Sequence, residues 1–526
     1  MALIFNLVAF FAIVLLPICF GFYVYLRLFS RVSLSQNLPW AGSIDGGCIS
    51  RARSTLRSVL STRELLEHGY NQYSKLNKPF VLPSILTGPE VIIPLSQLNW
   101  LLEQPEEVCS QNEVNRQFLQ ADYTMLHPNV IKDMVHADVI RKELTKQLGD
   151  FTNDVVEELD SAMRQAWGTD PKWKEIEVYK TMAEIISRLS NRVLVGQDLC
   201  RNESYLKNSG SFARGVVIVA AVLNMTPAVI KPYLAPIVTW WDRRLYQNCA
   251  KHVLPIIYER LRLPPGKAGG AVPNDYIQWA INHAINHDNP EERTPDMISK
   301  RLSVLTFAAI QSSAITLTNL IFDLASASSG GIFFAETFLA EMRQEVATVL
   351  SDGDGSWNKA SLAKMIKVDS ALRESMRLCG FVSRGVSKMV VVPDGVTLPD
   401  GTHVPHGVRV GVSAYSIHHD EAIYPGAKTF DAFRFADSGT RITAENEERK
   451  STSLVTTSAS FMAFSHGRHA CPGRFFAAQQ LKLTLAYIAL NYDIEPIRSR
   501  PENKWFVGSM GPPMSEKVRI RRRRGA

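Results

Sequence analysis

The chain has 526 residues, is 46% hydrophobic and carries a net charge of +7, which allows a large buried core and excludes a disordered protein. Its seven cysteines are scattered and odd in number, which argues against a disulfide framework or a zinc site and favours a reducing compartment. Since the basic residues are not interleaved with aromatic residues on one face, we expect no nucleic-acid partner, and we interpret the basic run over 517–524 as a solvated tail.

The N-terminal segment Met1–Leu26 contains no charged side chain and is long enough to cross a bilayer as a helix. The alternative, a cleaved signal peptide, is disfavoured because there is no basic start and the apolar run is too long. Arginines 27 and 31 follow the run, so the positive-inside rule places the rest of the chain in the cytosol. We predict a single transmembrane anchor over 1–28, a hinge over 29–50 that contains a stiff turn at Leu38–Gly42, and one globular domain over 51–526.

The next two hundred residues are predicted to be mainly helical. Apolar residues recur at helical spacing over 136–159, and apolar segments at 210–223 and 237–261 are separated by three prolines. Thr294-Pro295-Asp296 then offers an N-cap, a proline at the first helical position and an acidic first turn. The helix that it starts can run to about residue 325, roughly 45 Å, which predicts a helix that crosses the whole domain.

Small and polar residues interrupt this long helix at Ala308-Ala309-Ile310-Gln311-Ser312-Ser313. Taken alone, such a run usually serves close packing. The hydroxyl of Ser312 can also bond to the preceding turn and bend the helix or relay a proton.

A later helix places Glu374 and Arg377 on one face, three residues apart. Alternating β-branched runs bounded by Pro-Asp-Gly turns predict a small sheet between about residues 386 and 414. The run His418-His419-Asp420 could bind a metal, but we expect an exposed loop there.

A lone cysteine, Cys471, lies between a glycine-bearing loop and a predicted helix that begins at Pro472. Residues 475, 478, 481, 485, 488 and 489 form the apolar face of that helix. A helix N-terminus favours a thiolate, and Gly467 and Gly473 would let the backbone approach something flat and bulky beside the sulfur. Such a thiolate suits an axial ligand of haem iron, although a lone cysteine is more often a small buried hydrophobe.

The segment around this cysteine resembles the haem-binding signature of the cytochrome P450 family. Phe464, Gly467, Cys471 and Gly473 stand at the signature positions, and His469 stands where the family has an arginine that contacts a haem propionate. The resemblance implies that Cys471 ligates the iron and that this segment binds the haem.

Three further motifs occur in the family's order. The run at 308–313 resembles its oxygen-activation motif, with Gln311 at the position of the usual acid and Ser312 at that of the hydroxyl residue. Glu374 and Arg377 match the family's buried Glu-x-x-Arg pair, and Arg434 matches the second arginine that locks it, so these three residues are expected to be structural.

The resemblance also implies two propionate contacts and a lid. Arg384 matches the family's usual propionate arginine, and Arg141 stands where members often have a second one, although the tryptophan that accompanies it is replaced by Ala137. The apolar segments at 210–223 and 237–261 correspond to the mobile lid over the substrate channel, which dips into the membrane. A plain pair of buried helices fits their pattern equally well.

We therefore expect the cytochrome P450 fold, mainly α with a minor β region, behind one membrane anchor in the endoplasmic reticulum. The family's reaction is monooxygenation, in which one atom of O₂ enters the substrate at a haem whose thiolate promotes O–O cleavage. A reductase partner supplying NADPH electrons is implied. The strings over 118–124 and 471–477 resemble fungal members that oxidise terpenoids, indole-diterpenes or related secondary metabolites, so we expect a lipophilic substrate.

Two other functions remain open. One is a haem-thiolate isomerase or dehydratase that does not use O₂, which the replacement of the acid by Gln311 permits. The other is a haem-binding sensor without enzymatic activity. Consumption of NADPH and O₂ coupled to a substrate would separate the three.

Overall fold

Most of the described chain is helical. The computed structural model describes residues 37–43, 47–262, 273–329, 332–333, 335–436, 453–506 and 508–524, together with positions 21, 24, 34 and 35. The predicted anchor over 1–28 lies outside these residues except at positions 21 and 24, and it stays a prediction. Within the described part, α14 (Glu203–Asn224) and α18 (Pro295–Ser326) have the length and hydropathy of a membrane span, but more than half of the apolar window of α18 is buried in the protein.

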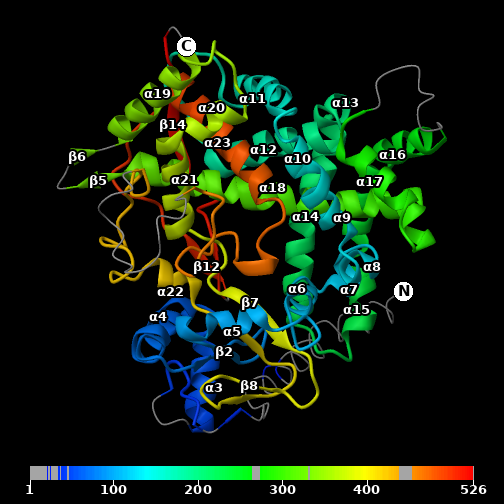
Figure 1. Cartoon of the computed structure of the whole chain (residues 1–526), viewed down its shortest axis with the longest axis vertical. Helices are drawn as coiled ribbons and strands as arrows, with labels where there is room; N and C mark the ends of the chain where they lie inside the picture. Colours follow the sequence, from blue (N-terminus) through cyan, green and yellow to red (C-terminus); the bar gives the residue numbers. More distant parts are fainter. Residues whose placement is uncertain are drawn as a thin grey trace, which may run out of the picture.

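A helical region forms the larger part of the molecule and surrounds α18 (Figure 1). Its other long helices are α11 (Thr152–Trp167), α12 (Val178–Leu194), α16 (Trp240–Arg262), α17 (Tyr276–Ile285), α19 (Ala335–Ser351), α21 (Ile366–Leu378) and α23 (Arg474–Asn491). Short helices fill the connections: α6 (Gln111–Leu119), α7 (Ala121–Thr124), α8 (Asn129–Lys132), α13 (Gln197–Cys200), α15 (Lys231–Val238), α20 (Lys359–Lys364) and α22 (Ala414–His418). The largest hydrophobic core lies between α11, α12, α18, α21 and α23.

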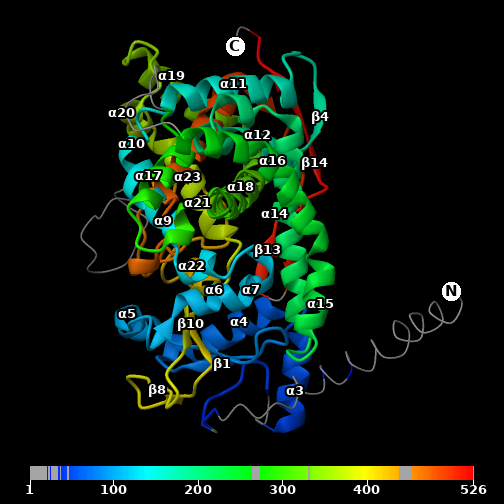
Figure 2. The same cartoon turned by 90° about the vertical axis from the view of Figure 1, so that its right-hand side faces the viewer.

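The central helix α18 begins where its capping residues predict. The Thr294 hydroxyl accepts a hydrogen bond from the Met297 N–H at 3.2 Å, and Pro295 occupies the first helical position. The helix continues to Ser326 and runs through the middle of the molecule, where Figure 2 shows it close to end-on. The predicted long helix is confirmed.

The predicted helix over 136–159 is wrong as a continuous element. The chain forms α9 (Val135–Val139), a π-helical turn (Ile140–Leu144) and α10 (Thr145–Gln147), then makes a turn before α11. The turn contains Gly149, a poor helix former. The Gln479 amide of α23 donates to the Leu148 carbonyl at 2.9 Å, so a contact distant in sequence satisfies the backbone that the helix leaves unpaired.

A five-stranded sheet forms the smaller region, in the order β1-β2-β10-β7-β3. Strand β10 runs parallel to β2 and antiparallel to β7, and the remaining pairs are antiparallel. The strands are β1 (Phe80–Leu82), β2 (Glu90–Ile92), β3 (Cys109–Ser110), β7 (Gly385–Val390) and β10 (Arg409–Val412). Helices α4 (Thr62–Gln72) and α5 (Leu98–Glu103) pack with them, and α3 (Cys48–Arg57) precedes α4 in the chain. Strands β7 and β10 confirm the small sheet predicted between residues 386 and 414, together with the hairpin β8 (Val396–Thr397) and β9 (His403–Val404).

The turn at Leu38–Gly42, predicted to belong to the hinge, packs on this sheet. Trp40 bridges Val81 of β1, and the Ala41 N–H donates to the Val81 carbonyl at 2.9 Å. Gly42 has a φ of 74°, and a Cβ there would lie 2.5 Å from the Leu65 side chain. The compact body of the protein therefore includes this turn.

The charge of the C-terminal run predicted a solvated tail. This prediction is wrong, because most of the run forms a paired strand. β14 (Lys517–Arg522) lies between β4 (Lys174–Glu177) and β11 (Tyr492–Ile494). Its cations face acids of these neighbours: Lys517 with Glu175 at 2.8 Å, Arg519 with Glu495 at 2.9 Å and Arg521 with Asp493 at 3.0 Å. Two-stranded pairs complete the β structure: β5 (Ser328–Ser329) with β6 (Ile332–Phe333), and β12 (Lys504–Phe506) with β13 (Ser509–Gly511).

A buried carboxylate lies at the contact between α14 and α16. Asp242 of α16 is only 4% exposed, and it faces Gly215 of α14, where a Cβ would lie 1.9 Å from Oδ1. Its Oδ2 has no hydrogen-bond partner within the described part of the chain. Burial raises the pKa of Asp242 to about 6, because the charged form loses its hydration.

We expect Asp242→Asn to stabilise the protein more at pH 7.5 than at pH 5. The pKa of this carboxyl is higher in the folded chain than its ordinary value of 3.8, so folding stability decreases as the pH rises through roughly 4 to 6. The cost of ionising the buried group is of the order of 2–3 kcal/mol, and the neutral amide removes it. Melting temperatures of both proteins at the two pH values measure this. An equal difference at both pH values would show that Asp242 does not titrate in this range.

Candidate active site

The loop before α23 holds Cys471 through its backbone. The Cys471 N–H donates to the Phe464 carbonyl at 2.9 Å, and the Phe464 side chain is buried in the main core. Two positive φ angles shape the loop, 61° at Ser465 and 74° at Gly467. A Cβ at Gly467 would lie 2.6 Å from the Leu102 side chain, so this glycine makes room for α5 as well as for the turn.

The helix after the cysteine begins later than predicted. Pro472 and Gly473 form a turn, and α23 starts at Arg474, so Pro472 is not its first residue. The predicted apolar positions 478, 481, 485, 488 and 489 are buried, but Phe475 is 36% exposed and lies under the Arg474 guanidinium at 4.5 Å. The neighbouring Phe476 enters the core in its place.

Three influences set the pKa of the Cys471 thiol. Burial raises it, whereas a hydrogen bond from the Gly473 backbone and the positive charge of Arg474 lower it. In the protein alone burial prevails. A cation bound to the sulfur would offset this burial cost, so the environment suits a metal-bound thiolate better than a free one.

The polar segment of α18 has an open side. Ala308 is exposed although it lies in the middle of a helix that crosses the protein, and Ala309, Gln311 and Ser312 are half-buried. The Ser312 hydroxyl donates to the Ala308 carbonyl at 3.2 Å. Gln311 accepts a hydrogen bond from the Tyr179 hydroxyl of α12 at 2.6 Å. The polar segment lies on α18, and the cysteine loop directly precedes α23. These two helices pack against each other.

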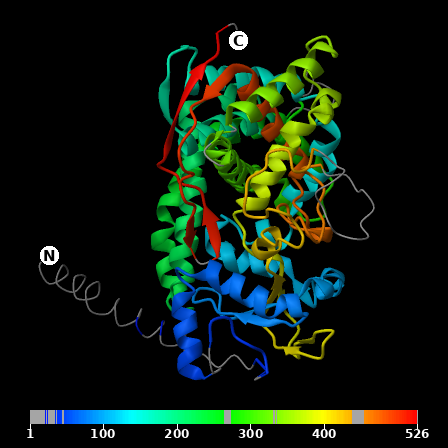
Figure 3. The ribbon, with the colours of Figure 1, turned by 90° about the vertical axis from the view of Figure 1, so that its left-hand side faces the viewer.

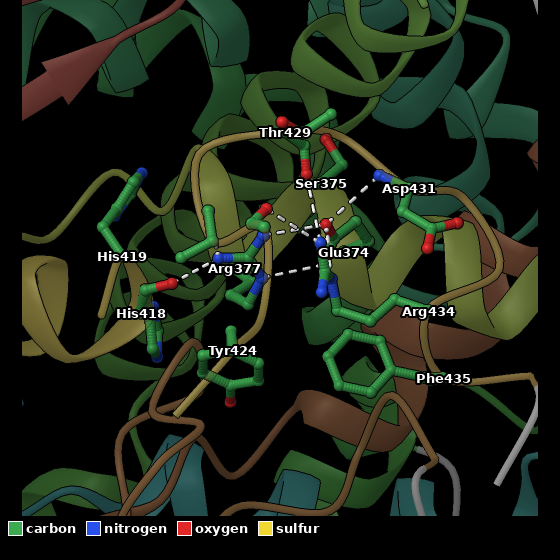
Figure 4. A network of polar contacts seen from close by, with 12 residues as sticks. Glu374, Ser375, Arg377, His418, His419, Tyr424, Thr429, Asp431, Arg434 and Phe435 are labelled. Atoms are coloured by element: carbon green, nitrogen blue, oxygen red, sulfur yellow. Dashed lines mark hydrogen bonds and ion pairs between the residues drawn. The ribbon is translucent and has the colours of Figure 1, made fainter. Parts of the chain in front are cut away.

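Glu374 forms a buried cluster with both of the arginines predicted to contact it (Figure 4). Arg377 donates from Nε and Nη2 to the two carboxylate oxygens, each at 2.8 Å, and Arg434 donates from Nε at 2.9 Å. Glu374 and Arg377 are fully buried, and the Arg434 side chain is 3% exposed. Each guanidinium also binds backbone carbonyls of the loop after α22, at residues 418 and 427 for Arg377 and 425, 426 and 429 for Arg434.

The run His418-His419-Asp420 is not an exposed loop, contrary to expectation. His418 and Asp420 are buried, and His418 Nε2 accepts from the Met462 N–H at 3.0 Å. Asp420 accepts from the Tyr70 hydroxyl and the Lys75 ammonium, both at 2.8 Å. No group of three potential metal ligands occurs anywhere in the described ranges.

The predicted propionate arginine, Arg384, has a different partner in this structure. Its Nε lies 2.8 Å from Glu90, which is buried on β2 and also receives a bond from Thr87. Its Nη1 is buried with no hydrogen-bond partner in the described part of the chain. A Cβ at Gly508 would lie 2.2 Å from this nitrogen, so the glycine leaves the space that the guanidinium needs.

His469 and Arg141 lie near each other, apart from Arg384. His469 Nε2 is 2.9 Å from Glu106, and burial lowers the pKa of His469, with Glu106 opposing and the charges of Lys388, Arg468 and Arg141 reinforcing the effect. Arg141 itself is largely exposed and pairs with Asp138 at 2.8 Å. The charge of Arg141 acts on His469, so the N-terminal end of the π-helical turn lies within electrostatic range of the cysteine loop.

A family model described as cytochrome P450 matches residues 106–515, which include the cysteine loop, the Glu374 cluster and all of α18. The chain belongs to the cytochrome P450 family. As a P450 it is an oxidoreductase with a monooxygenase role, and the family implies a haem bound by a cysteine thiolate, a redox partner and a small substrate.

Similar proteins extend over almost the whole P450 chain. The cytochrome P450 monooxygenases gloP of Glarea lozoyensis and htyF of Aspergillus rugulosus are each 34% identical, over 90% and 87% of this chain and 89% and 68% of their own. The monooxygenase polB of Polytolypa hystricis is 31% identical over 95% of this chain and 96% of its own. The solved structure of retinoic acid-bound cyanobacterial CYP120A1 has a TM-score of 0.62 at 15% identity, covers 93% of this chain and 97% of its own, and supports the fold alone.

Three features of this P450 fit a large flat group between α18 and the cysteine loop. A Cβ at Gly473 would meet nothing within 4 Å, so there is open space directly after Cys471. Ala308 is exposed on the central helix. Arg384 has a buried donor without a partner, which suits an anionic substituent such as a propionate. The residues present therefore fit a haem.

Several residues at this site escaped prediction. Glu90, Glu106 and Tyr179 each contact a predicted site residue, yet they lie more than a hundred residues from it in the chain. No local spacing indicates such pairs. Glu90 is an acidic residue within an apolar strand. Because a buried acid needs a cationic partner, this residue is the one sequence signal for such a pair.

Proposed function

We propose that this P450 is a haem-thiolate monooxygenase in which the thiolate of Cys471 would bind the haem iron and the substrate is lipophilic. The observation that carries the proposal is the Cys471 loop, where the half-buried thiol receives a hydrogen bond from the Gly473 N–H and open space lies beside Gly473. When bound, haem supplies the chemistry that reduces O₂ and transfers one oxygen atom. The resemblance to fungal oxidases of terpenoids and indole-diterpenes and the similarity to fungal relatives support a secondary metabolite as substrate.

The chain's own residues would bind and orient the haem. Arg384, with a free Nη1, is the donor best prepared for a propionate, and its Nε contact with Glu90 fixes the guanidinium. His469 is held by Glu106, and Arg141 is near enough to influence it, so these two could contact a propionate at the other side. Phe464, Gly467 and Gly473 shape the loop around the sulfur. Glu374, Arg377 and Arg434 act structurally, through the fold.

Ser312 and Gln311 would control protons at the site where O₂ is reduced. The Ser312 hydroxyl bonds to the Ala308 carbonyl and has lone pairs that can hold a water on the open side of α18. Gln311 cannot donate a proton as the usual acid would, so its amide serves to hold that water. We assign the relay to Ser312 and its water.

The proposal is tested with full-length protein, a NADPH-dependent reductase and extracts that contain lipophilic metabolites. The expected result is consumption of NADPH and O₂ in step with an oxygenated product that carries ¹⁸O from ¹⁸O₂. A product formed without O₂ would support the isomerase alternative, and bound haem without any product from an active pathway would support the sensor.

Ser312→Ala should form less product per NADPH and more peroxide, while substrate binding remains. Removing a positioned proton donor typically lowers the rate by about 10²-fold. Gln311→Ala should have the milder effect, because it removes only a group that holds the water. Product and peroxide are measured per NADPH consumed. Unchanged coupling in Ser312→Ala would place the proton relay at another residue.

We further propose that the protein is anchored in the endoplasmic reticulum membrane by residues 1–28, with the catalytic domain in the cytosol beside its reductase. An exposed apolar surface supports this. Its members on α15 and the start of α16 include Tyr233 at 78%, Ile237 at 72% and Trp241 at 61% exposure. Ile49 of α3 and Leu60 after it are also exposed. Figures 2 and 3 show α15 along one edge of the molecule with α3 below it, and Figure 1 shows that the two helices are separated along the direction of those views.

Deleting residues 1–28 should release much of the protein from membranes and leave the haem site intact. The apolar surface on α15 should retain part of the shortened protein at the bilayer, because burying it there removes apolar area from water. Membrane flotation and haem content measure the two effects. Secretion of the full-length chain, or glycosylation at Asn202, would contradict the proposed orientation.

A further inference from the structure

One hydrogen bond joins the polar segment of the central helix to a neighbouring helix. The hydroxyl of Tyr179, the second residue of α12, donates to Oε1 of Gln311 at 2.6 Å. Helix α12 packs along α18. Tyr179 is half-buried at this junction, so the bond is only partly exposed to competing water.

This bond determines how the Gln311 amide can be used. An amide has an accepting oxygen at one end and two donor hydrogens at the other, and the two ends can exchange by rotation. With Oε1 held by Tyr179, the Nε2 end forms no hydrogen bond to any described side chain and is available as a donor. Gln311 directly precedes Ser312, whose hydroxyl is bonded to the Ala308 carbonyl.

The surroundings of Tyr179 keep its hydroxyl protonated and therefore able to donate. Burial raises the pKa of Tyr179, and the positive charge of Arg214 on α14 opposes this effect. Arg214 is exposed and contacts Ser211 of its own helix at 3.2 Å, so solvent screens its charge.

We propose that Tyr179 is a positioning residue of the oxygen-reducing site, which fixes the Gln311 amide with its donor end free for the water that Ser312 holds. This inference rests on the proposed monooxygenase function. Tyr179 touches neither substrate nor oxygen, and it acts only through Gln311. Without its hydroxyl the amide can rotate, and a rotated amide presents an acceptor where the water needs a donor.

Tyr179→Phe tests the proposal, since it removes one hydroxyl and keeps the ring. Losing a single hydrogen bond of this kind corresponds to about a two- to tenfold effect. We expect product per NADPH to fall by that factor, peroxide to rise, and substrate affinity to stay unchanged. In the Gln311→Ala background the same substitution should have no further effect, because the group that Tyr179 holds is already absent.

The C–O stretching band of the carbon monoxide complex provides a readout independent of turnover. It responds to hydrogen-bond donors that face the bound gas, so it should shift or broaden in Tyr179→Phe and Gln311→Ala alike. Tyr205→Phe is the matched control, because that buried hydroxyl contacts Thr306, also on α18 but more than one turn away. It should leave the band and the peroxide fraction unchanged.

Two results would overturn the inference. One is a Tyr179→Phe protein with the wild-type band and wild-type coupling. The other is a further loss in the double variant beyond that of Gln311→Ala, which would show that Tyr179 acts independently of the amide. A wild-type protein that uses no O₂ would instead refute the proposed function, and the band would still report whether Tyr179 orients Gln311.

Discussion

Cys471→Ser should abolish the monooxygenase activity and the strongly red-shifted Soret band that a reduced haem-thiolate protein shows with carbon monoxide. A serine hydroxyl is far less acidic than a thiol, and neither the Gly473 N–H nor the charge of Arg474 is enough to hold it as an anion. The loss should be complete rather than partial, because the five other cysteines in the described part of the chain lie outside this loop. Spectra of the reduced protein with carbon monoxide and turnover with NADPH measure it.

Cys379→Ser is the matched control for this experiment. Cys379 is also half-buried, and its sulfur lies 3.2 Å from the Arg500 guanidinium, a contact that a serine oxygen can replace. This variant should retain the band. Normal turnover in Cys471→Ser, or loss of the band in both variants, would refute Cys471 as the ligand.

Glu374→Gln should strongly destabilise the fold and lower the haem content of the purified protein. The substitution removes the only carboxylate that the side chains of Arg377 and Arg434 contact in the described structure, and both guanidiniums are almost fully buried. Breaking a buried ion pair by removing one partner typically costs about 3–5 kcal/mol. Domains are stable by only about 5–15 kcal/mol, so this loss is a large part of the total. Denaturant unfolding and haem content of the purified variant measure it.

Glu175→Gln is the comparison for Glu374→Gln. Glu175 pairs with Lys517 at 2.8 Å, but both side chains are about half exposed, and water replaces the lost contact. Its unfolding midpoint should stay close to that of the wild type. If Glu374→Gln unfolded at the same midpoint as Glu175→Gln, the cluster would not brace the fold.

The sequence predicts correctly those features that depend on residues close together in the chain. The capping residues at Thr294 and Pro295 predict the start of α18 to the residue, because a helix start depends on three neighbouring positions. The spacing of Glu374 and Arg377 likewise predicts that they share a helix face. Arg434 was placed beside them only by resemblance to a family, since nothing within the chain's own pattern connects positions sixty residues apart.

Two of the wrong predictions concern segments whose structure depends on contacts with distant parts of the chain. The helix over 136–159 breaks where Gln479 of α23 pairs with the Leu148 carbonyl, and the basic run at the C-terminal end becomes a strand because acids of β4 and β11 face it. The start of α23 was misplaced for a different reason. Pro472 suits a first helical position, but it also suits a turn, and the chain uses it to bring the Gly473 N–H to the sulfur.

The loop between α22 and Arg434 is held to the protein through its main chain. Arg377 and Arg434 bind four of its carbonyl groups and the carbonyl of His418, the last residue of α22. Every residue type has a main-chain carbonyl, so these bonds depend on the number of residues in the loop and not on their types. Among homologues this segment should therefore keep a constant number of residues, and its exposed positions without side-chain contacts should tolerate other residue types. An insertion of one residue would move a carbonyl away from its guanidinium, whereas an exchange of Lys428 for another polar residue would move none.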